Sequence, residues 1–246
     1  MATSADTIVP REGRGFMADQ AFFTRMAIAL ALLILFGFAQ FAARGFVDIG
    51  KVPPFMHAHG IIMVAWLGLF VTQNLLVQRG SIATHRTLGW AGVALAAAVV
   101  VSGGYTVHQA LALGMVPPFF SNAFFLALVW SGLAGFLVLV LLAIVRRRDT
   151  QAHRRLMLGS LILITEPAFG RLLPAPLIGG ELTEWLIFAI QLAMIALLAR
   201  HDRKVLGGIH PATVVVAAVA FAVHLALSLL SRTAVVEGIA AGIAAG

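Results

Sequence analysis

The sequence predicts an all-α integral membrane protein built from seven transmembrane helices. Three observations lead to this fold class. The chain is 61% hydrophobic and 11% charged, whereas about a quarter of the residues in a soluble domain carry a charge. Five long stretches contain no Asp, Glu, Lys or Arg, namely 26–43, 52–78, 87–145, 185–199 and 205–231. A helix needs ~20 apolar residues to cross a membrane, so the third stretch is long enough for two spans and a turn.

Residues that begin or end helices separate the expected spans. The seven spans are 22–43, 56–78, 87–108, 119–145, 155–174, 183–199 and 211–231. The pair Pro53–Pro54 opens the second, since Pro is tolerated in the first turn of a helix. Gly114 and Pro117 divide the third from the fourth, Pro174 ends the fifth, and Pro211 begins the seventh.

The basic residues are divided unevenly between the two sides of the expected bundle. Thirteen of the 17 Lys and Arg residues lie in the N-terminal segment and in the loops on its side, which are 79–86, 146–155 and 200–210. Loops rich in positive charge stay in the cytoplasm, so we expect the N-terminus inside and the C-terminus outside the inner (plasma) membrane of a bacterium. The expected parts are a cytoplasmic tail over 1–21, a transmembrane domain over 22–231 and an extracytoplasmic tail over 232–246.

Composition also excludes several classes of function. The net charge of +7 comes from basic residues in short loops. Such residues set the orientation of a protein in the lipid bilayer, so the charge does not indicate nucleic-acid binding. A sequence without Cys has no disulfide, thiolate metal site or iron–sulfur cluster. The two lysines, Lys51 and Lys204, lie in loops, whereas a retinal Schiff base requires a lysine inside the membrane.

A short motif occurs twice and indicates an internal repeat. The segment H-R-T-L-G begins at His85, and the segment H-R-R-L-M begins at His153. Each follows an Arg-containing loop and opens a span directed outward. We therefore expect two parallel hairpins, over 56–108 and 119–174, because duplicated helical units are common in membrane proteins.

Ionisable side chains inside the expected spans form two layers, and such residues are costly in hydrocarbon unless they serve a function. His85 and His153 form the inner layer. The outer layer contains His57, His59, His108, Glu166, Arg171 and His224. Glu166 and Arg171 are the candidates for a catalytic pair, and a structural ion pair between them is the alternative.

Electron transfer through haem b is the first function that fits these layers, because axial histidines from facing helices hold haem iron. His85 and His153 are the expected ligands of an inner haem, with Arg86 and Arg154 as partners of its propionates. The candidates for an outer haem are His59 with His108 or His224, and Gln73 lies on the same helical stripe as His59.

The second and third spans also resemble a known hairpin. The segment from His59-Gly60 through Met63, Trp66 and Arg79 to His85-Arg86 and Gly103 is similar to the core of transmembrane di-haem b-type cytochromes of the ferric reductase type. This resemblance implies electron transfer with a redox partner. The chain departs from that family because 119–145 contains no His, where those cytochromes carry a ligand.

A second resemblance covers the second to fifth spans. H-x-H-G at 57–60 and H-R-x-L-G at 85–89 resemble an uncharacterised family of small bacterial multi-span membrane proteins. This resemblance implies the architecture alone.

Two other classes of function are open. A zinc-dependent intramembrane hydrolase would take its metal ligands and general base from the outer layer. Its candidate residues are His57, His59, His108, His224 and Glu166. The other class is a membrane assembly factor, or a quinone- or lipid-binding subunit, in which the histidines only donate and accept hydrogen bonds.

Overall fold

The computed structural model describes residues 11–246, with side chains from Asp19 onward, and this part of the chain is helical without strands. The long helices are α1 (Arg11–Ala43), α2 (Pro54–Gln78), α3 (Ile82–Ala112), α4 (Asn122–Val145), α8 (Gly180–Leu206) and α9 (Pro211–Leu230). The short ones are α5 (Thr150–Leu163), α6 (Glu166–Leu172), α7 (Ala175–Ile178), α10 (Ala234–Ala244) and a 3-10 turn at Ile49–Lys51. Part of the expected tail 1–21 lies outside the described residues, and the rest belongs to α1.

Six helices are long and apolar enough to cross a membrane, namely α2, α3, α4, α8, α9 and the part of α1 from Asp19. The prediction of an all-α protein with several helices long and apolar enough to cross a membrane is confirmed. The expected fifth span, 155–174, has a different form. It is divided between α5, with 14 residues, and α6, with 7 residues, and neither is long enough to cross a bilayer alone.

Pro167 explains the division of this segment. Proline has no N–H, and its ring clashes with the carbonyl four residues earlier, which belongs to Leu163, the last residue of α5. Side chains bind the carbonyls that the break leaves free. Thr165 Oγ1 donates to the Ile162 carbonyl at 2.6 Å, and Gln191 Nε2 of α8 donates to the Leu163 carbonyl at 3.1 Å. Such bonds are needed where a helix is interrupted away from water.

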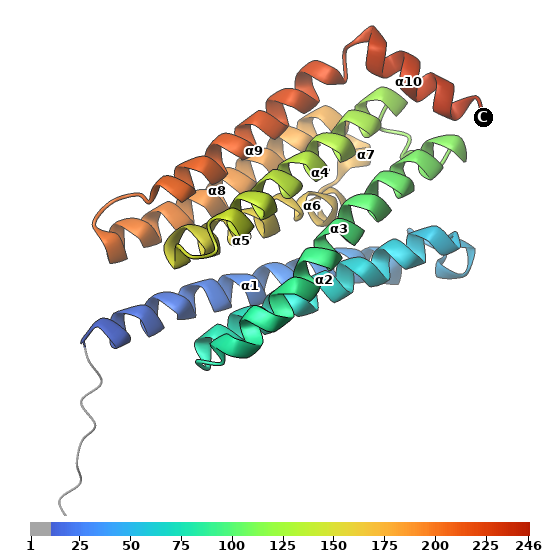
Figure 1. Cartoon of the computed structure of the whole chain (residues 1–246). Coiled ribbons are helices and arrows are strands. Elements are labelled where there is room, and N and C mark those ends of the chain that lie inside the picture. The colour runs from blue at the N-terminus through green and yellow to red at the C-terminus, as the bar shows by residue number, and fades with distance from the viewer. Residues whose placement is uncertain (1–10) are drawn as a thin grey trace, which may run out of the picture.

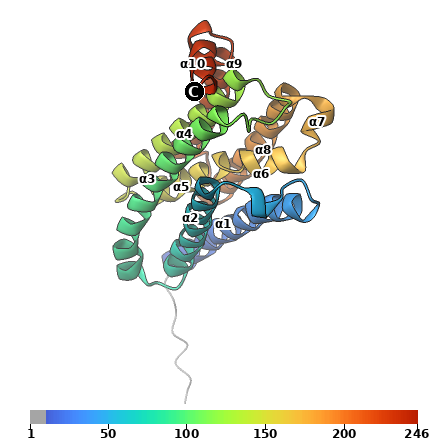
Figure 2. The same cartoon turned by 90° about the vertical axis from the view of Figure 1, so that its right-hand side faces the viewer.

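The helices form a bundle of two groups, which Figures 1 and 2 show from two directions. Helices α1 and α2 pack together in one group, and α4, α5, α8 and α9 form the other. Helix α3 starts beside α2 and crosses obliquely to α4. Helix α6 packs against α1 and α8. Helix α10 folds back against α3 and α4, so most of the expected C-terminal tail 232–246 is helical.

Close packing holds the helices together both within the second group and between the two groups. Phe136 and Leu139 of α4 are completely buried, and the ring of Trp66 on α2 meets Phe136 edge-on at 5.3 Å. Helix α5 approaches α9 at Gly159, where a Cβ atom would lie 2.4 Å from Cγ2 of Val216. A residue without a side chain is therefore required at this crossing.

Candidate functional site

Two histidines lie opposite each other at the end of the bundle where α3 and α5 begin. His85 is the fourth residue of α3, and His153 is the fourth residue of α5. Their ring centres are 6.3 Å apart, and the ring planes meet at 83°. Both helices pack against α4, so their first turns are neighbours. The structure thus brings together the two residues expected to form the inner layer.

Hydrogen bonding fixes the orientation of His153. Its Nδ1 lies 2.9 Å from the carbonyl oxygen of Ala143 on α4. Since a carbonyl only accepts, Nδ1 carries the proton and Nε2 keeps its lone pair. The Nδ1 of His85 is buried near the backbone of Gln73 and makes no hydrogen bond of good geometry within the described part of the chain. The side-chain oxygen of Gln73 is also buried without a partner there, and Arg86 is exposed.

The two arginines after the second histidine belong to a separate network, which we call the inner clasp. Arg155 donates to Oδ1 of Asp202 from Nε at 2.8 Å and from Nη2 at 2.6 Å, and both side chains are fully buried. Arg154 forms an ion pair with Asp19 of α1, and the other oxygen of Asp19 lies 2.6 Å from Nε2 of His201. Arg154, expected to bind a haem propionate, is therefore engaged by Asp19 in this structure.

The inner clasp also fixes the start of α9. Oδ2 of Asp202 accepts from the His210 backbone N–H at 3.1 Å and from Thr213 Oγ1 at 2.5 Å. Nδ1 of His210 accepts from the Ala212 backbone N–H at 3.1 Å, which requires that this nitrogen be unprotonated. Burial, and then the nearby charge of Arg155, lowers the pKa of His210 and favours the neutral ring. The clasp joins α1, α5, α8 and α9 and has a structural role.

Two carboxyl groups meet where α6 approaches α8. The carboxyl groups of Glu166 and Glu184 lie within hydrogen-bonding reach of each other, and Glu184 is only 5% exposed. The charge of Arg171 acts on Glu166, while its Nη1 donates to the Pro167 carbonyl at 2.7 Å. The charges of Glu166 and Arg171 thus interact, but the two residues form no direct salt bridge within the described chain. The hydrogen-bond partner of Glu166 is Glu184.

His224 of α9 lies beside this carboxyl pair. Its ring stacks on Phe188 with the centres 4.3 Å apart and meets Trp185 edge-on at the same distance. Its Nε2 is buried and has no hydrogen-bond partner among the described residues. His224 and Glu184 line the same small hollow, with a volume of about 10 Å³.

The other outer histidines lie in separate surroundings. Nδ1 of His59 on α2 is 2.9 Å from Oγ of Ser102 on α3, His57 is exposed, and His108 lines a cavity next to α10. In the described part of the chain, no group of three or more His, Cys, Asp or Glu residues could hold a metal ion. The zinc-dependent hydrolase therefore stays a prediction. The described residues form no metal site that would support it.

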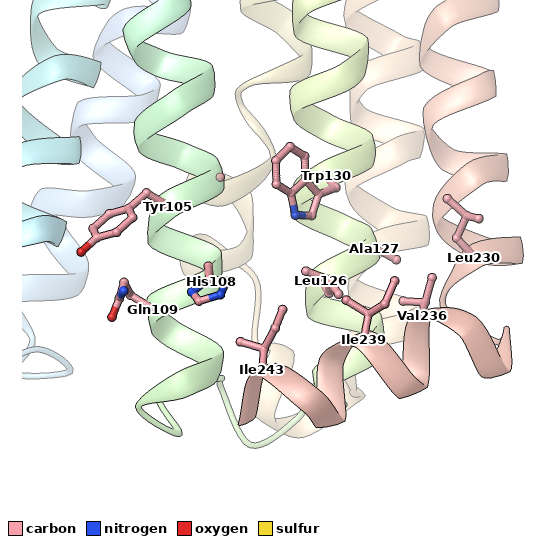
Figure 3. Close-up of a pocket in the computed structure, with 11 residues that line it drawn as sticks. Tyr105, His108, Gln109, Leu126, Ala127, Trp130, Leu230, Val236, Ile239 and Ile243 are labelled. Atoms are coloured by element: carbon pink, nitrogen blue, oxygen red, sulfur yellow. The ribbon is translucent and has the colours of Figure 1, made fainter. Parts of the chain in front are cut away.

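The cavity beside His108 has a volume of about 700 Å³ and lies between α3, α4 and α10 (Figure 3). Its lining consists of Gly104, Tyr105, His108, Gln109, Leu126, Ala127, Trp130, Leu230, Val236, Ile239 and Ile243. The strongly polar groups come from α3 alone, and α10 supplies only aliphatic side chains. Volume and lining match a site for a largely apolar ligand, since ligand pockets measure roughly 300–1,000 Å³.

Comparisons with protein-family models, with curated proteins and with solved structures find no match to this chain. The assignment of a function therefore depends on the chemistry of these sites.

Proposed function

We propose that this protein binds one haem b near the inner face of a bacterial plasma membrane and transfers electrons through it. The observation that carries the proposal is the pairing of His85 with His153. An imidazole nitrogen binds a transition metal at about 2 Å, so two imidazoles on opposite sides of one iron have ring centres roughly 6 Å apart. The measured separation of 6.3 Å fits this requirement. Haem held by His85 and His153 would supply one-electron transfer between its ferrous and ferric states.

The surroundings of the two histidines support the same assignment. The bond from His153 Nδ1 to the Ala143 carbonyl leaves Nε2 as the ligand atom, and such a bond is typical of metal-binding histidines. On His85, Nδ1 lies near the backbone of Gln73, and a bond there would likewise leave Nε2 as the ligand atom. The exposed Arg86 can pair with a propionate. Because Arg154 already forms an ion pair with Asp19, Arg86 is the better partner for a propionate.

The proposed topology counts α5 and α6 as one interrupted span. Seven crossings then put the two termini on opposite sides of the membrane, and the thirteen-to-four division of basic residues favours the N-terminus inside and the C-terminus outside. The His85–His153 pair lies on the basic, cytoplasmic side, so we expect its redox partner there. His59 is bonded to Ser102 and His224 lies beside Glu184, so the proposal includes one haem and no outer one.

An absorption spectrum tests this proposal. We expect the protein, purified after expression with ample haem, to hold about one haem per chain, with a Soret band that sharpens on reduction. His85→Ala and His153→Ala should each reduce the bound haem at least tenfold. His57→Ala is the matched control, because His57 is exposed, and it should keep the wild-type spectrum. A colourless wild-type protein would contradict the proposal.

A second candidate function is favoured by the cavity beside His108. Its volume of about 700 Å³ and its aliphatic lining, with His108 as the polar group on one side (Figure 3), suit a quinone or a lipid tail with a polar head. We expect a water-soluble quinone analogue to quench tryptophan fluorescence saturably, because Trp130 lines the cavity. Ile239→Trp should fill the cavity and weaken binding, whereas Val214→Trp on the exposed face of α9 should not. Equal binding in both variants would reject this site.

A further inference from the structure

The hydrogen bond between Glu166 and Glu184 defines a protonation state. An ionised carboxylate only accepts hydrogen bonds, so a bond between two carboxyl groups requires a proton on one of them. Two carboxyl groups this close share one proton, because two negative charges repel each other strongly away from water. Arg171 supplies a positive charge beside Glu166, which balances the single negative charge that is left.

The carboxyl pair is connected to a second polar group through the small hollow between α8 and α9. Oε1 of Glu184 is buried and without a hydrogen-bond partner in the described chain, and so is Nε2 of His224. Both residues line the hollow, whose volume is about 10 Å³. That volume holds roughly one ordered water molecule, which needs at least two polar partners. The two unpartnered atoms are such partners.

The hollow leads from the carboxyl pair towards the outer surface of the bundle. Its lining also includes Ser228 of α9 and Glu181 of α8. Glu181 is exposed and forms an ion pair with the exposed Arg232. The charged and titratable groups near the path are thus Arg171 on α6, Glu181 on α8 and Arg232 after α9. Helix α4 contributes only Phe124 to the lining.

We propose that Glu166, Glu184 and His224 form a proton relay in the outer half of the protein, with one water molecule between Glu184 and His224. In the outward step, the O–H bond that holds the shared proton on the carboxyl pair breaks, and the water molecule accepts this proton. The water passes one of its own protons to Nε2 of His224. The imidazolium then loses a proton to the outer aqueous phase. The carboxyl pair becomes a dianion beside Arg171, and the reverse sequence reloads it. No electron moves, and the relay is independent of haem binding.

Infrared spectroscopy tests the shared proton. At pH 7, the wild-type protein should show the carbonyl stretching band of a protonated carboxylic acid, and this band should shift when D₂O replaces H₂O. Glu184→Gln should abolish the band. Glu166→Gln should shift it, because the partner of Glu184 changes from a carboxyl group to an amide. Glu181→Gln, an exposed position on the same helix, is the control and should leave the band unchanged. A wild-type spectrum without the band, or a band unaltered in both Glu184→Gln and Glu166→Gln, would overturn the proposal.

The rate of deuterium exchange at this band tests the path. His224→Phe keeps a flat ring against Phe188 and removes both ring nitrogens. The variant should keep the infrared band. Deuterium exchange at the band should slow by about a hundredfold, which is typical for the loss of an acid–base group. His108→Phe, in the cavity next to α10, should exchange as fast as the wild type. Because His224→Phe retains the carboxyl pair, its result does not depend on whether Glu184→Gln folds. Exchange at the wild-type rate in His224→Phe would reject the relay.

Discussion

Arg155 and Asp202 form an ion pair from which water is completely excluded, although both residues lie near the inner end of the bundle. The arginine donates two hydrogen bonds to one oxygen of Asp202, and the other oxygen accepts from Thr213 and from the backbone of His210. Burying an ion pair is costly unless its remaining polar atoms are bonded. Here the bonds join three helices, so the pair fixes their relative positions.

Removing one partner of this pair should destabilise the protein strongly. We predict that Asp202→Ala lowers the free energy of unfolding by about 3–5 kcal/mol, because Arg155 then stays buried without its counter-charge. Arg232→Gln breaks the exposed pair with Glu181 and should cost less than about 1 kcal/mol. Unfolding in SDS, followed by circular dichroism, measures both. Similar small effects for the two variants would contradict a structural role for the clasp.

The interrupted span depends on Gln191, which donates to the carbonyls of Ile162 and Leu163 at the end of α5. We predict that Gln191→Leu costs about 1–3 kcal/mol, since it leaves the carbonyl of Leu163 unpaired, whereas the Ile162 carbonyl keeps its bond from Thr165. Gln109→Leu is the control, because the side chain of Gln109, unlike that of Gln191, donates no hydrogen bond to a carbonyl of another helix in the described chain, and its loss should cost little. A Gln191→Leu variant as stable as the wild type would show that α5 and α6 do not need this bond.

The contact between α5 and α9 at Gly159 allows a test of the packing. Gly159→Ala should destabilise the protein by about 1–3 kcal/mol, because the new Cβ would lie 2.4 Å from Val216. Val216→Ala should relieve part of this loss in the double variant, since the two residues are in contact. Strictly additive effects in thermal unfolding would place the two helices further apart than the structure does.

The histidine at the start of α9 makes stability depend on pH. Burial lowers the pKa of His210 from its ordinary value near 6.5, so protonation favours the unfolded chain. The stabilisation is therefore complete above about pH 6.5 and is lost as the pH falls below it. Asn also caps helices but does not titrate, so His210→Asn should lose less stability than the wild type between pH 7 and pH 5. An equal loss in both proteins would assign the effect to other groups.

The sequence predicted the long helices well, because uncharged stretches and Pro or Gly boundaries follow from the cost of burying charge and from backbone geometry. It did not predict the division of 155–174, although Pro167 was visible, because proline within a membrane span can kink a helix or end it. Which outcome occurs depends on tertiary partners for the freed carbonyls, and Gln191 comes from another helix.

The candidate site was predicted only in part. His85 and His153 were expected to meet because equivalent positions in two hairpins lie at one depth. Depth alone does not fix the direction in which a helix presents a side chain, so the partners of His59 and His224 were not foreseen. Glu184 was missed because it lies at the start of its expected span, where an acid is usually exposed, and its burial follows from α6 folding against α8.

Low-temperature electron paramagnetic resonance of the oxidised protein tests the central claim most directly. Two axial imidazoles with nearly perpendicular planes, as in the 83° arrangement of His85 and His153, give a strongly anisotropic low-spin ferric signal. We predict this signal at about one iron per chain, and its replacement by a high-spin signal or its loss in His85→Ala and in His153→Ala. A low-spin signal that persists unchanged in both variants, or a wild-type protein without haem iron, would contradict the assignment.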